Sequence, residues 1–193
     1  MNTISGGGGL CIDHPLGVSA ACAASQVDIT FGPSCSISPP FASDFNTNDG
    51  EFRFQTGFWY TDSGVLYGGA GTGYTVGHAG TCIPTLEDAP SRTFSATIAN
   101  LNGAQAGMYF SEKGGTRIVA ISGDSNLYSE DTITGVMTPI GTIAAPGLSM
   151  AIAVTNQNIG GVAIPDDLWD ENGAAGLVVR DGPTVEFSSY SVA

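Results

Sequence analysis

Residues 176–192 read GLVVRDGPTVEFSSYSV, two apolar-rich segments separated by a short turn. Both segments, Gly176–Arg180 and Thr184–Val192, carry the β-branched and aromatic residues that strands favour. Asp181-Gly182-Pro183 between them is a turn sequence with a physical basis, because glycine supplies a positive φ and proline fixes its own φ. This stretch therefore predicts a strand, a turn and a closing strand.

Segments of the same kind recur upstream as far as about residue 44. The clearest are Glu51–Tyr60, Arg92–Ala99, Thr116–Ser122 and Leu148–Thr155, of which the last is apolar enough for a central strand. Lys113-Gly114-Gly115 has the composition of a hairpin turn. No segment keeps a 3.6-residue apolar period, so the sequence predicts an all-β chain folded as an antiparallel jelly-roll sandwich.

The first 43 residues differ from the rest. They contain the run Gly6–Gly9, an Ala/Ser-rich stretch and a single alternating segment, Gln26–Phe31. We expect residues 1–43 to form an irregular N-terminal arm that orders against a neighbouring subunit, and residues 44–193 to form the jelly-roll domain. A disordered leader followed by one edge strand is the alternative. The four cysteines are Cys11, Cys22, Cys35 and Cys82, and their spacing leaves both a disulfide and free buried thiols open.

The charge of the chain limits its partners. Eighteen acidic and 5 basic residues give a formal net charge of −13, which repels phosphate backbones and anionic lipid. We therefore expect no nucleic-acid partner. We also expect no membrane insertion, because no apolar run reaches the roughly 20 residues that a membrane span needs. The first residues, MNTISGGGGL, show no basic and apolar pattern of a secretory signal peptide.

The final strands carry a family resemblance. Gly173–Arg180, Asp181-Gly182 and Val185–Val192 resemble the last two strands of concanavalin A-like (laminin-G-like) jelly rolls. Ser188 and Ser189 stand where that family commonly has acidic or amide residues. Domains of this family commonly bind glycans and occur in fibres and spikes of bacteriophages and gene transfer agents.

Together with the all-β class and the missing secretion pattern, the resemblance leads us to expect a non-enzymatic virion-surface protein, of spike, fibre or decoration type, that is assembled in the cytoplasm without a signal peptide. Its expected partners are host-surface polysaccharide, neighbouring virion proteins bound through the N-terminal arm, and further copies of itself. Two alternatives remain: a purely structural particle subunit without glycan binding, and a jelly-roll polysaccharide hydrolase or lyase.

We predict no catalytic residues, because each catalytic motif lacks a partner. Gly123-Asp124-Ser125 resembles the nucleophile block of GDSL-type hydrolases, but Ser125 needs a histidine base. His14 and His78 both precede it, whereas that family places its histidine downstream. A turn between strands explains the motif. Adjacent acids such as Glu130-Asp131 point to opposite faces of a strand, so they do not form a glycosidase pair.

Aromatic residues are the candidate ligand-binding groups. Flat rings with a polar edge suit glycan recognition, and the candidates are Trp59, Tyr60, Tyr67, Tyr74 and Trp169. Clustered oxygens around Trp169 make Asp166, Asp167 and Asp170 candidate Ca²⁺ ligands, although we expect no cofactor to be required. The alternative for this run is an acidic surface turn whose tryptophan packs on the core.

Overall fold

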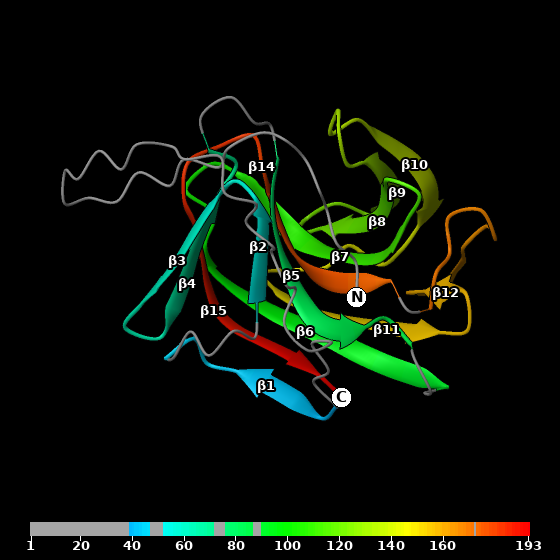
Figure 1. Cartoon of the computed structure of the whole chain (residues 1–193), viewed down its shortest axis with the longest axis horizontal. Helices are drawn as coiled ribbons and strands as arrows, with labels where there is room; N and C mark the ends of the chain where they lie inside the picture. Colours follow the sequence, from blue (N-terminus) through cyan, green and yellow to red (C-terminus); the bar gives the residue numbers. More distant parts are fainter. Residues whose placement is uncertain (1–38, 47–51, 72–75, 87–89, 172) are drawn as a thin grey trace, which may run out of the picture. The chain divides into compact units, whose positions relative to one another are not determined.

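The computed structural model describes residues 39–46, 52–71, 76–86, 90–171 and 173–193. Within them the chain forms strands, turns and bends without a helix, and the strands build two antiparallel sheets packed as a sandwich (Figure 1). The described part of the chain contains no helix of the length and apolarity needed to span a membrane. The predicted all-β, jelly-roll-like sandwich is confirmed.

We call the two sheets A and B. In spatial order, the path through sheet A is β13 (Val162–Ala163), β12 (Asn158–Ile159), β11 (Ser149–Thr155), β6 (Ser91–Asn100), β15 (Val185–Val192), β4 (Val65–Gly69) and β3 (Phe58–Asp62). The short strand β1 (Phe41–Ser43) pairs with the second half of β15. Sheet B runs in the order β10 (Met137–Thr142), β9 (Asn126–Asp131), β8 (Thr116–Ile121), β7 (Gln105–Lys113), β14 (Ala174–Arg180), β5 (Val76–Pro84) and β2 (Phe52–Thr56).

The core lies between the two sheets and follows the alternation of the strands. In β6, Phe94, Ala96 and Ile98 are buried while the residues between them face outward. Strand β15 contributes Val185 and Phe187 to the same cluster, and sheet B contributes its own inward-facing residues, chiefly Met108, Phe110, Ile118, Ala120, Leu177 and Val179. Burial of this apolar surface is the main force that holds the sheets together.

Two turn predictions have different outcomes. The Lys113-Gly114-Gly115 hairpin is confirmed: β7 and β8 pair antiparallel, with positive φ at both glycines. The turn at Asp181 is confirmed as a turn, but the positive φ belongs to Asp181 rather than Gly182. Gly182 is needed for space, because a Cβ there would lie 2.5 Å from the Ala104 side chain. Strands β14 and β15 do not pair with each other but belong to different sheets.

The segment Glu51–Tyr60, expected as one strand, crosses from one sheet to the other. It breaks at Gly57 into β2 of sheet B and β3 of sheet A. Gly57 has a φ of 79°, and a Cβ there would lie 2.2 Å from the Gly69 carbonyl oxygen and 2.8 Å from the Gly77 Cα. Only a glycine fits this crossing, because both the conformation and the close backbone approach exclude a side chain.

We expect Gly57→Ala to lower the free energy of unfolding by at least about 2 kcal/mol, since it combines a strained φ with a backbone clash. Urea denaturation of the purified chain measures this. Gly103→Ala is the matched control, because Gly103 has a φ of 83° but no atom within 4 Å of the added Cβ. The free energy of unfolding of this control should fall by only about 1 kcal/mol. Equal losses in the two variants would show that the backbone at Gly57 shifts to admit the side chain.

Strand β11 lies inside the sheet A path, where it pairs with β6 on one side and with β12 on the other, and its residues alternate between buried and exposed. Residues Phe41–Ser43 pair with β15, so the sandwich begins before residue 44. The rest of the predicted arm, as far as residue 38, lies outside the described residues. The same holds for Cys11, Cys22 and Cys35 and for the side chain of Cys82.

Candidate functional site

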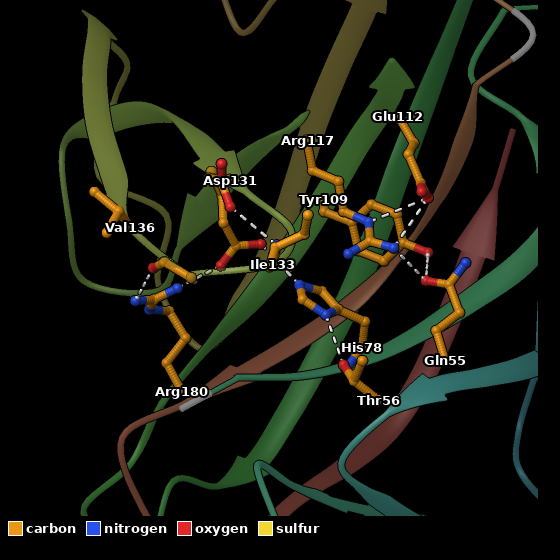
Figure 2. A network of polar contacts seen from close by, with 12 residues as sticks. Gln55, Thr56, His78, Tyr109, Glu112, Arg117, Asp131, Ile133, Val136 and Arg180 are labelled. Atoms are coloured by element: carbon orange, nitrogen blue, oxygen red, sulfur yellow. Dashed lines mark hydrogen bonds and ion pairs between the residues drawn. The ribbon is translucent and has the colours of Figure 1, made fainter. Parts of the chain in front are cut away.

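Four strands of sheet B, namely β5, β7, β8 and β14, are buried on both faces over most of their described residues, although sheets of sandwiches usually expose one face. Their outward-facing residues form a second, smaller apolar cluster of Val76, Tyr109, Val119, Ile121 and Val178. Beside this cluster, polar and charged side chains lie on the same outward face of neighbouring strands (Figure 2).

His78, Glu130 and Arg180 form the centre of this polar group. The His78 Nε2 lies 2.7 Å from one carboxylate oxygen of Glu130, and Arg180 Nη1 donates to the other. The Nδ1 of His78 lies 2.8 Å from the Thr56 hydroxyl oxygen. Because Glu130 faces a guanidinium and accepts hydrogen bonds, His78 donates from Nε2 and accepts at Nδ1, which is the neutral form. We call these three residues, His78, Glu130 and Arg180, the buried triad.

A second ion pair lies next to the buried triad. Arg117 Nη2 donates to Glu112 at 3.0 Å and to the Gln55 side-chain oxygen at 2.7 Å. Its guanidinium stands over the Tyr109 ring, 4.9 Å from the centroid, in a cation–π arrangement. Burial, which outweighs the nearby Arg117 charge, raises the pKa of Tyr109, so this phenol stays protonated. The two ion pairs and the neutral histidine leave the group without net charge.

The burial of the triad favours a structural role. His78 is 1% exposed and Glu130 is 0% exposed, so neither side chain is open to a substrate in this conformation. The structure places His78 inside this network. The sequence could not reveal its partner, because 52 residues separate His78 from Glu130 and the strands between them are brought together only by the fold.

We expect stability to fall as the pH drops below about 6.5. Burial lowers the pKa of His78 more than the Glu130 hydrogen bond raises it. An unfolded histidine titrates near 6.5, so below that pH the unfolded chain binds a proton that the folded chain does not. The contribution of the neutral His78 to the free energy of unfolding is therefore fully present at neutral pH. It decreases as the pH falls below about 6.5, with a slope of at most about 1.4 kcal/mol per pH unit.

Urea denaturation between pH 7.5 and pH 5 measures this slope. His78→Gln is the matched variant, because glutamine keeps a donor for Glu130 but does not titrate. We expect its stability to be nearly flat over the same interval. Equal slopes in the two proteins would contradict the assignment to His78. Carboxyls whose pKa is lowered by hydrogen bonds, such as those of Asp124 and Asp131, change the stability only at lower pH, where carboxyl groups titrate.

The buried triad also fixes the turn between β9 and β10. Arg180 Nη2 donates to the Gly135 carbonyl at 2.7 Å. Within the turn, one Asp131 carboxylate oxygen accepts from the backbone N–H groups of Ile133 and Thr134, at 3.0 and 2.7 Å. The turn is thus fixed by hydrogen bonds to its own Asp131 carboxylate and by the hydrogen bond from Arg180 to the Gly135 carbonyl.

The predicted aromatic residues Tyr60 and Tyr67 meet on the outward face of sheet A. They oppose each other across β3 and β4, and their rings stack with centroids 4.8 Å apart and an interplanar angle of 7°. Glu186 of β15 opposes Tyr67 on the other side. We call Tyr60, Tyr67 and Glu186 the tyrosine row. Figure 1 shows the hairpin β3–β4 that carries the two rings.

The surroundings of the tyrosine row are exposed and acidic. Tyr60 is 50% exposed, and Phe58, two residues earlier on the same strand, is 40% exposed. Asp62 follows on the same face of β3. Partial removal from water, and then the negative charges of Glu186 and Asp62, raise the pKa of Tyr67. The site therefore offers stacked rings flanked by two carboxylates.

The other two predicted ligand-binding residues among those described, Trp59 and Trp169, pack against the core. Trp59 points inward from β3, stacks on Phe187 at 6.2 Å between centroids, and donates from its indole N–H to the Thr56 carbonyl. Trp169 is buried in the core, which matches the alternative of a tryptophan packed under an acidic turn. Tyr74 lies outside the described residues. Sequence alone did not single out Phe58 or Glu186, although alternation along β3 places Phe58 with Tyr60.

The predicted Ca²⁺ ligands do not converge. Among the described residues, no group of three or more histidine, cysteine, aspartate or glutamate side chains is arranged to hold a metal ion. Gln157 donates to the Asp166 carboxylate at 2.7 Å. Lys113 Nζ donates hydrogen bonds to the backbone carbonyl oxygens of Asp166 and Trp169, so these two oxygens of the turn bind an ammonium group.

The Gly-Asp-Ser motif is a turn between β8 and β9, as predicted. The Asp124 carboxylate accepts from the Asn126 backbone N–H at 2.8 Å and from the Tyr128 hydroxyl at 2.6 Å. The first bond is that of an Asx turn, and the second ties the aspartate to the strand that follows. They account for the motif without a nucleophile.

Comparison with protein-family models gives no match, and comparison with curated proteins gives none either.

Proposed function

We propose that this chain is a non-enzymatic glycan-binding module of a particle surface, and that the tyrosine row is where it contacts the sugar. The observation that carries the proposal is the exposed, stacked pair Tyr60 and Tyr67 with Glu186 beside it. A tyrosine ring gives a flat apolar surface to the apolar face of a sugar, while hydroxyl and carboxylate groups bind sugar hydroxyls.

The particle setting is supported by the resemblance of the last two strands to concanavalin A-like jelly rolls. In this proposal the chain is a spike, fibre or decoration protein, its first 43 residues attach to neighbouring virion proteins, and its partner outside is host-surface polysaccharide.

The test is retention of the purified full chain on a panel of immobilised bacterial surface polysaccharides, with and without EDTA. Saturable retention that EDTA leaves unchanged supports glycan binding without a metal. Failure on every polysaccharide would contradict it and favour the purely structural particle subunit. Release of soluble oligosaccharides from the columns would contradict the non-enzymatic part and favour a hydrolase or lyase.

A further inference from the structure

The charges around the tyrosine row select among sugars. Glu186 lies directly across from Tyr67, and Asp62 lies two residues beyond Tyr60 on the same face of β3. Asp62 is exposed and Glu186 is partly exposed, so both carboxylates are within reach of a ligand stacked on the rings. A ligand at this site therefore approaches two negative charges that flank an aromatic surface.

The basic residues of the protein lie elsewhere. The backbone of Arg53 belongs to β2, and Lys113, Arg117 and Arg180 belong to β7, β8 and β14, all in sheet B. Arg92 is the one basic residue within the described strands of sheet A, and it is buried on the inward side of β6. The described outward face of sheet A thus offers an acidic ligand no guanidinium or ammonium group to pair with.

We propose that the tyrosine row binds glycans that carry free, protonated amino groups, in preference to N-acetylated, neutral or acidic sugars. This inference rests on the proposed glycan binding. An ammonium group attached to a sugar ring gains from three features of the site at once. It is attracted to the face of a tyrosine ring, it donates charge-assisted hydrogen bonds to Glu186 or Asp62, and it experiences the negative field of a chain with a formal charge of −13.

A pair of oligosaccharides that differ only in acetylation tests the inference. Isothermal titration compares the glucosamine hexamer with the N-acetylglucosamine hexamer at pH 5.5 and low salt, with the neutral glucose hexamer as a third probe. We expect the glucosamine hexamer to bind at least about tenfold more tightly. This preference should shrink as salt rises from about 0.01 M to 1 M, because salt screens exposed charges.

Charge-neutral variants locate the effect. Glu186→Gln and Asp62→Asn should each reduce the preference for the glucosamine hexamer while leaving the weaker binding of the acetylated hexamer in place. Glu171→Gln removes the same charge from the exposed loop before β14 and should keep the preference. Loss of the preference in Glu171→Gln would show that only the overall charge matters, which would overturn the assignment to this site.

The outcomes separate this inference from the proposed function. Equal binding of the acetylated, deacetylated and neutral hexamers would overturn the preference for amino sugars and keep glycan binding. No binding of any sugar, together with binding of an oligolysine peptide, would overturn both and assign the site to a basic protein partner. Tighter binding of the glucosamine hexamer that is lost in Glu186→Gln or Asp62→Asn supports both.

Discussion

Glu130→Gln is expected to lower the free energy of unfolding by about 3–5 kcal/mol, the largest effect of any single substitution considered in this protein. The Glu130 side chain is fully buried and is shared between Arg180 and His78. Its replacement by a neutral amide leaves the buried Arg180 guanidinium without a counter-charge, and an unpaired buried charge is among the most destabilising defects in a fold. Urea denaturation at pH 7.5 measures the loss.

A double variant shows that the missing counter-charge is the cause. Glu130→Gln with Arg180→Met removes both charges, and we expect it to be less destabilised than Glu130→Gln alone. Glu171→Gln, an exposed acid, is the surface control and should stay within about 0.5 kcal/mol of the wild type. A loss below about 1 kcal/mol in Glu130→Gln would contradict the buried triad as a major source of stability.

Local chemistry made the strands and turns predictable. Alternation of apolar residues identifies β6, and two consecutive glycines identify the hairpin turn after Lys113, because each signal acts over a few residues. The sheet change at Gly57 was missed because the apolar pattern continues across it. What decides the break is a close approach to Gly69 and Gly77, and those contacts exist only once both sheets are in place.

The candidate site was predictable only in part, for the same reason. Tyr60 and Tyr67 were recognised as aromatic candidates, but their stacking depends on the register of β3 and β4. Glu186 joins them because β15 pairs with β4, and 119 positions of sequence separate it from Tyr67. Residue type therefore names candidates, while the register of distant strands decides which of them meet.

Tyr60→Ala is expected to weaken binding to the retained polysaccharide about 30-fold while leaving the protein folded. Truncation of an exposed aromatic residue at the centre of a contact commonly costs about 2 kcal/mol, which corresponds to that factor in Kd. The free energy of unfolding should fall by only about 1 kcal/mol, because the substitution removes the stacked cross-strand pair with Tyr67 but leaves the core residues in place. Titration and urea denaturation of the same preparation measure both quantities.

Two variants control for this interpretation. Tyr60→Phe keeps the stacked ring, so its affinity should stay within about threefold of the wild type if the ring face is what binds the sugar. Tyr128→Ala removes a partly exposed tyrosine from β9 of sheet B and should leave affinity unchanged. If Tyr60→Ala binds as the wild type does, the sugar lies elsewhere on the protein. If Tyr128→Ala loses affinity instead, the contact lies on sheet B, because Tyr128 and the tyrosine row belong to different sheets.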